Sequence, residues 1–409
     1  MMKKLLSLLL ALSMVLSLAA CGGSSTSTTS DSTDSDTSAA ADTTESGTST
    51  AASDIKIAYI PKERAESFWQ AVEAGAQAAA DDLGVELVMY GDAAGSNTAA
   101  NQSTYVETAT ELGVNAIVFA ALDSDSTDAA LQSAQAEGIT VVGFDSDPGA
   151  EARDWFVNQV DPDELAAVLL DDLVENIGDQ YTADDPAEVY LVSTNLTTPN
   201  QNSWIEAIKR AYYSDYETVY DEDGAIDQDA CNSQTKSGSY TVNEAYAMLN
   251  VHVNPGADGD IIYAGDGDGL TELESFLTAH SDANALVSLT TNVIASCNSA
   301  IQSCGLEGQC IFNGIATPSD SEAYLENGNM TTVVLWQAYD LGYLAINTAY
   351  SAVAGELESG ATEYVSNLCG QTQVEGVSTY ADTHKVDGAV VYLGGPATFT
   401  LDTLSCWKS

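Results

Sequence analysis

The segment Ile55-Lys56-Ile57-Ala58-Tyr59-Ile60 begins the pattern that decides the fold. This run of apolar and β-branched residues predicts a strand, and the amphipathic stretch 68–83 predicts the helix that follows it. Gly84 comes next, and glycine readily adopts the left-handed conformation that ends a helix. The apolar run 85–90 then predicts a second strand.

The same order of elements recurs along the chain. Gly113 precedes the predicted strand 114–121, and Gly138 precedes the predicted strand 139–144. A second series predicts strands at 188–193, 285–289, 310–314 and 332–336, with helices at 203–213, 292–304, 321–327 and 339–356. Strands that alternate with helices form parallel sheets covered on both faces. We therefore expect an α/β fold with two doubly wound parallel-sheet lobes.

The N-terminus has the pattern of an export signal. Lys3-Lys4 precedes the apolar stretch 5–20, which is shorter than the roughly 20 fully apolar residues of a spanning helix. Cys21 at the expected cleavage point makes residues 1–20 resemble a bacterial lipoprotein signal peptide, with Cys21 as the lipidated residue. The alternative is an ordinary secretory signal followed by a free cysteine. The Ser, Thr, Ala and Asp-rich stretch to residue 53 predicts a disordered linker. We expect an extracytoplasmic protein, lipid-anchored to the bacterial cell membrane.

The chain is strongly acidic, with 61 acidic and 11 basic residues and a formal net charge of −50. Such a surface repels nucleic acid and anionic lipid headgroups, so neither is an expected partner. The charge fits a need for solubility at a crowded cell surface, and a salt-adapted source would give a similar balance.

The cysteines favour disulfides over metal binding. Apart from Cys21 the chain has six, and an even set outside the cytoplasm predicts at least one disulfide with open pairing. The six are Cys231, Cys297, Cys304, Cys310, Cys369 and Cys406. The sequence has no C-x-x-C motif or Cys/His cluster that would predict a zinc site. An EF-hand calcium loop that began at Asp266 would need an oxygen ligand at its fifth position, which is Leu270. We expect no metal and no cofactor.

Polar and aromatic residues follow the predicted strands of both lobes. Ligands of such sheets bind at the carboxyl ends of strands. Aromatic faces beside Asp, Asn, Gln and Lys suit a polyhydroxylated ring. Each residue also has a structural interpretation as core, helix cap or solvated loop. The candidates are Lys62, Phe68, Trp69, Asp145, Asn200, Gln201, Trp204, Thr290, Thr291, Trp336 and Gln337.

Several motifs in this order resemble one family. The segment Ile57-Ala58-Tyr59-Ile60-Pro61-Lys62, its spacing to Phe68-Trp69, and Gly75-Ala76-Gln77 resemble the start of type I periplasmic sugar-binding proteins. Phe144-Asp145-Ser146-Asp147, Asn158-Gln159 and Asn200-Gln201-Asn202-Ser203-Trp204 are similar to the branch with the rhamnose-binding and autoinducer-2-binding proteins of ABC importers. Ala316-Thr317-Pro318 and Leu335-Trp336-Gln337 continue the resemblance.

The resemblance implies two lobes joined by three hinge strands that close over one ligand. The N-terminal lobe would comprise 54–157 and 338–372, and the C-terminal lobe 158–337 and 373–409. Lys62 and Asp145 would bind the ligand from the first lobe, and Asn200, Gln201 and the Thr290/Thr291 loop from the second. Gln337 would contact it at a hinge. Phe68 or Trp69, with Trp204 or Trp336, would sandwich the ring.

This resemblance implies a non-enzymatic, monomeric substrate-binding protein that delivers a small sugar or sugar-like ligand to an ABC permease. Asn200, Leu289 and Thr291 depart from the residues of autoinducer-2 binders, which weakens the alternative of a signal furanose. A sensory ligand-binding module is a further alternative, and a surface glycosidase a weaker one, since no catalytic motif is present. Residues 230–262 resemble an insertion without a family counterpart.

Overall fold

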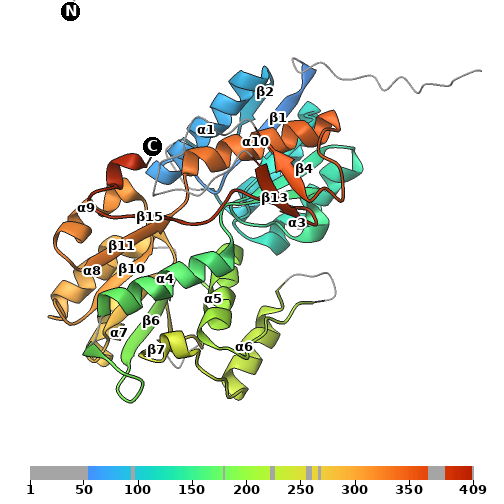
Figure 1. Cartoon of the computed structure of the whole chain (residues 1–409). Coiled ribbons are helices and arrows are strands. Elements are labelled where there is room, and N and C mark those ends of the chain that lie inside the picture. The colour runs from blue at the N-terminus through green and yellow to red at the C-terminus, as the bar shows by residue number, and fades with distance from the viewer. Residues whose placement is uncertain are drawn as a thin grey trace, which may run out of the picture. The chain divides into compact units, whose positions relative to one another are not determined.

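The computed structural model describes residues 54–93, 97–177, 180–221, 226–254, 260–265, 269–366 and 383–407. Within these residues the chain forms two mixed, mainly parallel β-sheets, each covered by helices (Figure 1). This confirms the α/β fold expected from the sequence. Cys21, Cys369 and the signal and linker segments lie outside the described residues. In the part that the structure describes, no helix is both long and apolar enough to span a bilayer.

The first sheet has the order β12-β13-β14-β5-β4-β3-β1-β2. From β2 to β14 neighbouring strands are parallel, and β13 and β12 add an antiparallel edge. Its strands are β1 (Lys56–Ile60), β2 (Glu86–Met89), β3 (Ala116–Phe119), β4 (Thr140–Phe144), β5 (Trp155–Asn158), β12 (Glu363–Val365), β13 (Thr383–Asp387) and β14 (Val390–Tyr392).

Helices bury both faces of this sheet. Along β1, Ile57 and Tyr59 join one apolar cluster while Ala58 and Ile60 join another, as the alternation of strand side chains requires. The first cluster includes α1 (Ser67–Leu83) and α10 (Ala338–Ala354), which lie side by side (Figure 1). The second lies under α2 (Ala99–Leu112) and α3 (Ser124–Ala136).

The second sheet repeats the plan with the order β15-β11-β10-β9-β6-β7, and β8 also pairs with β6. β15 is antiparallel to β11, and the other pairs are parallel. Its strands are β6 (Ala187–Ser193), β7 (Leu249–His252), β8 (Ile261–Tyr263), β9 (Ala285–Ser288), β10 (Ile311–Ile315), β11 (Met330–Leu335) and β15 (Ala397–Phe399).

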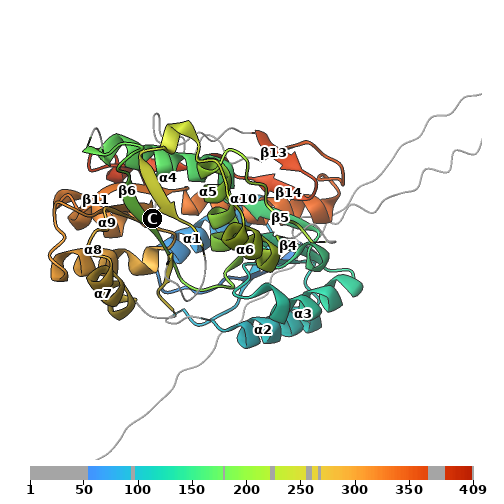
Figure 2. The same cartoon turned by 90° about the horizontal axis from the view of Figure 1, so that it is seen from below.

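Helices also lie on both sides of the second sheet. Seen from below, α4 and α5 lie on one side of β6 and β11, and α7 and α8 on the other (Figure 2). The helices of this lobe are α4 (Pro162–Ile177), α5 (Pro199–Tyr212), α6 (Gln228–Ser237), α7 (Leu270–Ala279), α8 (Ile294–Ser303) and α9 (Pro318–Glu326).

The local signals read from the sequence hold in the structure. Gly84, Gly113 and Gly138 follow α1, α2 and α3 with φ of 70°, 69° and 84°, the left-handed conformation expected after a helix. The chain passes between the two sheets at 159–161, 336–337 and 393–396, which agrees with three hinge strands.

Two sequence expectations differ from the structure. The C-terminal segment 373–409, expected in the second lobe, is divided, because β13 and β14 pair in the first sheet and β15 alone in the second. The suspected insertion 230–262 supplies β7 and β8, which continue the second sheet beside β6.

The expected disulfide is wrong for the cysteines that the structure describes. Each of these is a free thiol: Cys231, Cys297, Cys304, Cys310 and Cys406. Burial raises the pKa of the Cys310 thiol to about 12, and it raises that of Cys297 as well. These two side chains therefore behave as small apolar core groups.

Candidate functional site

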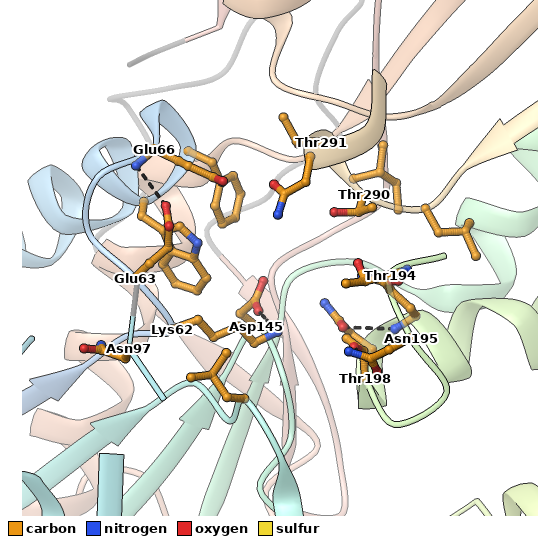
Figure 3. A pocket seen from close by; sticks show the side chains of 18 of the residues that line it. Lys62, Glu63, Glu66, Asn97, Asp145, Thr194, Asn195, Thr198, Thr290 and Thr291 are labelled. Carbon is orange, nitrogen blue, oxygen red and sulfur yellow. Dashed lines mark hydrogen bonds and ion pairs between the residues drawn. The ribbon is translucent and has the colours of Figure 1, made fainter. Parts of the chain in front are cut away.

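A cavity of about 570 Å³ lies between the carboxyl ends of the two sheets. Residues that follow β1, β2, β3 and β4 line it from the first lobe, and residues that follow or end β6, β8, β9, β10 and β11 line it from the second. In the strand order β2-β1-β3, the chain leaves β1 toward one edge of the sheet and then returns to its other side. β1 is therefore the topological switch point, where doubly wound sheets bind ligands. Figure 3 shows Lys62, Glu63 and Glu66 facing Thr194, Thr290 and Thr291 across this space.

The loops at this edge of the first sheet are tied together by one buried amide. Gln102 on α2 donates to the carbonyls of Pro61 and Ala120, and its side-chain oxygen accepts from the Leu122 N–H at 3.1 Å. Pro61 follows β1 and Leu122 follows β3, so Gln102 fixes the two loops at the switch point.

Lys62 and Asp145 form an ion pair inside the cavity. Lys62 Nζ lies 2.9 Å from Asp145 Oδ2, and the two side chains are 15% and 5% exposed. At this burial the charges are poorly screened, so the pair orients both side chains. Lys62 comes directly after Pro61 in the loop that follows β1, and Asp145 follows β4.

Asp145 also has a strained backbone. Its φ is +60°, and it is the one described non-glycine residue in the left-handed region. The Ser146 N–H donates to the Phe144 carbonyl at 2.6 Å, which makes Asp145 the centre of a three-residue turn. Such a conformation costs about 1–3 kcal/mol and is found mainly at functional sites, where it aims a side chain.

Aromatic rings form a continuous contact from the first lobe to the second. Phe68 contacts Trp69 edge-to-face at 5.2 Å and Trp336 at 6.0 Å between ring centroids. Trp336 in turn contacts Trp204 on α5 at 5.8 Å. These four residues line the cavity and are otherwise buried, so each is at once part of the core and of the cavity wall. The indole N–H of Trp336 has no hydrogen-bond partner.

In the second lobe, Gln201 closes the end of β6. Its side-chain oxygen accepts from Ser193 Oγ and the Thr194 N–H, each at 2.7 Å, and its nitrogen donates to Thr194 Oγ1. Asn195 caps the following loop, where its oxygen accepts from the Thr197 N–H at 2.8 Å. Gln201 therefore shapes the cavity wall, and its side-chain oxygen and one of its amide N–H groups are already hydrogen-bonded within the protein.

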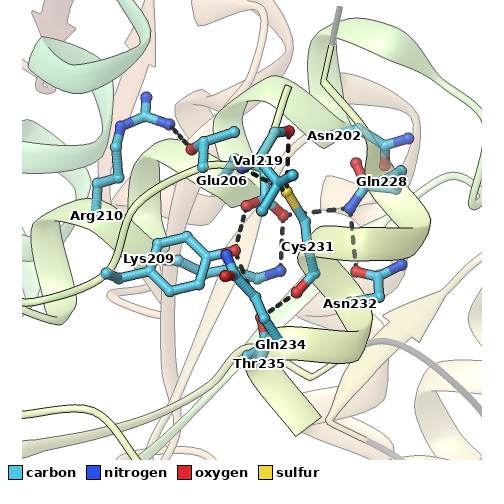
Figure 4. Close-up of polar contacts among 12 residues, drawn as sticks. Asn202, Glu206, Lys209, Arg210, Val219, Gln228, Cys231, Asn232, Gln234 and Thr235 are labelled. Atoms are coloured by element: carbon cyan, nitrogen blue, oxygen red, sulfur yellow. Dashed lines mark hydrogen bonds and ion pairs between the residues drawn. The ribbon is translucent and has the colours of Figure 1, made fainter. Parts of the chain in front are cut away.

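A buried ion pair holds α5 from its other face. Glu206 and Lys209 are fully buried, with Lys209 Nζ 2.7 Å from Glu206 Oε1. Tyr216 Oη and Gln228 Nε2 also donate to the Glu206 carboxylate (Figure 4). Gln228 begins α6, so the cluster joins α5 to α6 and fixes the helix that carries Trp204.

The candidates from the sequence converge on this cavity, with one exception. Lys62, Phe68, Trp69, Asp145, Asn200, Gln201, Trp204, Thr290, Thr291 and Trp336 all line it. Gln337 does not line it. Its side chain is fully buried, and its amide nitrogen donates to the Cys406 carbonyl near the C-terminus. Gln337 therefore anchors the crossing segment after β11 to the last described residues.

The cavity also has lining residues that the sequence did not single out. Directly after β6 come Thr194 and Asn195, and the strand-end rule would have found both. The others belong to loops whose lengths hide their geometry. They include Glu63, Glu66, Asn97, Thr98, Leu122, Thr198 and Asn292.

Glu66 is electrostatically the most perturbed of these. Partial burial, together with the nearby carboxylates of Glu63 and Asp320, raises the pKa of Glu66 to about 7. Asp320 lies in the first turn of α9, so this repulsion acts between the two lobes. Among the described residues no group of three or more His, Cys, Asp or Glu side chains is arranged to hold a metal ion.

Comparison with known proteins places this geometry in a family. Residues 57–259 and 260–357 match the family model described as "Periplasmic binding protein domain". LsrB from Clostridium saccharobutylicum in complex with AI-2 is 22% identical with a TM-score of 0.66, over 87% of this chain and 100% of that one.

Two further solved structures have the same fold. An ABC transporter solute-binding protein from Clostridium phytofermentas with bound L-rhamnose is 23% identical (TM-score 0.64, covering 86% of this chain and 98% of that one). A sugar ABC transporter from Actinomyces odontolyticus is 24% identical (TM-score 0.60, 88% and 99%). Since the family model spans most of the chain, this protein belongs to the periplasmic binding protein family, whose members bind solutes and are not enzymes.

Proposed function

We propose that this chain is the substrate-binding protein of an ABC importer, and that it captures a small sugar or sugar-like molecule by hinge closure. The observation that carries the proposal is the shared cavity, whose wall combines strand-end polar groups of both sheets with four aromatic residues. Its volume of about 570 Å³ suits one small ligand. Three chain crossings allow the two lobes to move about a hinge.

Polar and aromatic residues of the cavity would contact different parts of the ligand. Lys62 and Asp145 present a cation and an anion to ligand hydroxyls, while Asn200, Thr290 and Thr291 offer hydrogen bonds from the opposite lobe. Phe68, Trp69, Trp204 and Trp336 pack against the apolar faces of a sugar ring. A ligand that touches both lobes favours the closed form, which the permease then recognises.

The solved relatives support a sugar ligand without deciding which one. Five of these structures contain a bound ligand, which is L-rhamnose, D-arabinose, 5-methylthioribose, D-allose or AI-2. A furanose signal is the second candidate, supported by the similarity to LsrB and weakened by Asn200, Leu289 and Thr291. All of these molecules are small and rich in hydroxyl groups.

A thermal-shift screen of the purified protein against neutral pentoses, hexoses, deoxyhexoses and AI-2, followed by calorimetry of the hits, tests the proposal. At least one sugar should raise the melting temperature and bind with one-to-one stoichiometry. Trp204→Ala should weaken that binding, whereas Trp407→Ala, which removes a buried tryptophan outside the cavity lining, serves as the control for general loss of packing. Binding of no sugar at all would reject the function.

We also propose a lipid anchor, on the basis of the N-terminal sequence. Cys21 would carry the lipid, and the linker up to residue 53 would tether the binding lobes to the bacterial membrane. A Cys21→Ser variant expressed in a bacterial host should move from the membrane fraction to the medium or periplasm. Retention of this variant in the membrane would contradict lipidation at Cys21.

A further inference from the structure

His252 lies at a junction between two short strands on the edge of the second sheet. β7 and β8 lie in line along the same side of β6, since β7 pairs with residues 187–190 and β8 with residues 191–193. His252 is the last residue of β7, and Asp260 directly precedes β8. The His252 Nδ1 lies 3.6 Å from Asp260 Oδ1, so this contact joins the end of one strand to the start of the next.

Both ring nitrogens of His252 face a carboxylate. While Nδ1 faces Asp260, Nε2 lies 2.5 Å from Glu188 Oε2 on β6. Asn250 Nδ2 donates to the same Glu188 oxygen at 2.9 Å. A neutral imidazole has one N–H and can donate to only one of the two carboxylates, whereas an imidazolium donates from both nitrogens. The arrangement is therefore complete only when His252 is protonated.

The ring of His252 is also stacked in a position that suits a cation. Its plane lies at 11° to that of Tyr190, with the ring centroids 4.2 Å apart, and the two residues are partners in the register of β6 and β7. An aromatic face attracts a cation placed over it. None of the described lysine and arginine side chains forms an ion pair with Glu188 or Asp260. Within the described residues, His252 therefore supplies the positive charge that these two carboxylates meet.

The charges at the junction reinforce one another. Burial alone would lower the pKa of His252, but the contacts with Asp260 and Glu188 outweigh burial and raise the pKa above the usual histidine value of 6.5. Burial would likewise raise the pKa of Asp260, and the contact with His252 lowers it instead. The neighbouring tyrosines stay neutral over the same range, because burial raises the pKa of Tyr190 and of Tyr213 to about 12.

The other titratable groups around the junction contact tyrosines rather than His252. His280, which follows α7, lies with its Nδ1 3.3 Å from Tyr190 Oη. Asp282 acts on the same tyrosine, and Glu188 acts on Tyr212, whose pKa is raised by burial. His252 is thus the group through which a change of pH near neutrality acts on the two carboxylates.

The far ends of β6 and β8 belong to the cavity wall. After β8 the N–H groups of Ala264 and Gly265 donate to the carbonyls of Ser193 and Thr194 at 2.9 and 2.8 Å. Thr194 and Gly265 both line the cavity. From Asp260 to Gly265 an extended chain covers about 17 Å. Since β8 itself has three residues, a contact at its start bears on the placement of the whole segment.

We propose that His252 is a pH-dependent clamp that, when protonated, bridges Glu188 and Asp260 and fixes β8 against β6. Deprotonation removes one of the two bridges, so that β8 and the wall segment after it open to solvent more often. This inference goes beyond the proposed function, because it concerns the protein without ligand and holds whichever ligand the cavity takes.

The sign of the effect follows from the two pKa directions. A histidine whose pKa is raised on folding stabilises the fold below its unfolded pKa of about 6.5, and this contribution is lost as the pH rises through the folded value. The lowered pKa of Asp260 stabilises the fold above its unfolded value of about 4 and is lost as the pH falls. The clamp is therefore complete near pH 5.5 and open at pH 8.5.

Proton NMR of the full chain tests the protonation of His252. The chain has three histidines, His252, His280 and His384, so His252→Gln identifies the resonances of this ring. They should titrate with a midpoint above 6.5, and Asp260→Asn should lower that midpoint. Asp282→Asn, an exposed neighbouring carboxylate, is the matched control and should leave it unchanged. A midpoint at or below 6.5 in the wild type would overturn the inference.

Hydrogen exchange followed by mass spectrometry then tests whether the clamp protects β8. After correction for the intrinsic exchange rate, peptides that span β8 and Gly265 should exchange about fivefold more slowly at pH 5.5 than at pH 8.5, the upper range for a partly exposed ion pair. His252→Gln should abolish this difference, and peptides from β3 in the first sheet should show none in either protein.

Asp260→Asn keeps the volume of the side chain and removes its charge, so it should reduce the difference in β8 even if His252→Gln does not fold. Exchange of β8 that is independent of pH in the wild type would reject the clamp. A pH difference that persists unchanged in both variants would assign it to another group and equally overturn the inference.

Discussion

Ser67 donates a hydrogen bond of 2.9 Å to the carboxylate of Asp320 and so links the two lobes at the rim of the cavity. Ser67 is the first residue of α1, and Asp320 lies in the first turn of α9. The bond lies beside Glu66 and Phe68, which line the cavity from the same end of α1. A contact between lobes at this position stabilises the closed arrangement that a ligand requires.

Replacement of Ser67 by alanine should weaken ligand binding without loss of fold. A partly solvated hydrogen bond to a carboxylate contributes about 1 kcal/mol, which corresponds to about a fivefold loss of affinity. Isothermal titration calorimetry with the ligand identified by screening measures the loss. Ser133→Ala, an exposed helical serine on α3, is the control. Equal affinities of Ser67→Ala and wild type would mean that the Ser67–Asp320 hydrogen bond stabilises the free and the ligand-bound states equally.

Glu66 should make stability depend on pH in a defined direction. Its pKa in the folded protein is raised to about 7, so between its unfolded value and pH 7 the folded state binds more protons than the unfolded state. Stability from this group is therefore greatest at low pH and is lost as the pH rises toward 7.

Urea titrations of wild type and Glu66→Gln at pH 5 and pH 8 measure this contribution. The variant should gain stability relative to wild type at pH 8 and show a smaller difference at pH 5. The comparison cancels the other titrating groups, because both proteins share them. A difference that grows as the pH falls would contradict a raised pKa.

Two substitutions of Asp145 separate the effect of its charge from the effect of its backbone conformation. Asp145→Asn removes the charge that faces Lys62 but retains a side chain that tolerates a positive φ. Asp145→Ala removes the charge and must also hold alanine at a φ of +60°, which costs about 1 kcal/mol more. Both variants should bind ligand at least tenfold more weakly. In denaturation, alanine should be the less stable of the two; equal stability would show that the turn relaxes.

The fold could be predicted from the sequence because its signals are local. Strand runs, amphipathic helices and Gly84 or Gly113 at helix ends depend on neighbouring residues alone. The strand-end rule then placed Lys62, Asp145 and Thr290 in one cavity. Gln337 was assigned to ligand contact although its partner, the Cys406 carbonyl, lies near the far end of the chain, and no local pattern reveals such a contact.

Other features depend on distances that spacing in sequence does not give. The thiols of Cys297 and Cys310 are free, although an even number of cysteines favoured disulfides. β14 returns to the first sheet by pairing with β5, which is remote in the sequence, and β13 pairs with β14. Glu66 lies in a polar loop, and only the folded chain shows that Asp320 of the other lobe faces it.

The close contact of α1 with α10 should make Gly342 intolerant of any side chain. A Cβ atom at this position would lie 1.9 Å from the Val72 carbonyl oxygen, a backbone atom that cannot turn aside. Gly342→Ala should therefore destabilise the protein by about 3 kcal/mol, as overpacking does. Gly84→Ala is the matched control, since its Cβ meets open space and its φ of +70° alone costs about 1 kcal/mol. Chemical denaturation with similar losses for both glycines would contradict the packing argument.

The Glu206–Lys209 pair should affect the stability of the fold mainly when only one of the two partners is removed. Both side chains are fully buried, and Lys209→Met would leave the Glu206 carboxylate with hydrogen bonds from Tyr216 and Gln228 but without a cation (Figure 4). An uncompensated buried charge of this kind destabilises a protein by about 3–5 kcal/mol. Lys56→Met, which breaks the partly exposed pair with Glu86, should cost at most about 1 kcal/mol.

The double variant Glu206→Leu/Lys209→Met completes the test, because it removes both charges and fills their volume with apolar groups. It should recover most of the stability lost in Lys209→Met. Since α5 carries Trp204 into the cavity, ligand affinity should fall with Lys209→Met and return with the double variant. Denaturation and calorimetry on the same four proteins measure both effects. If the double variant is as unstable as Lys209→Met, the hydrogen bonds of Tyr216 and Gln228, rather than charge balance, hold α5 to α6.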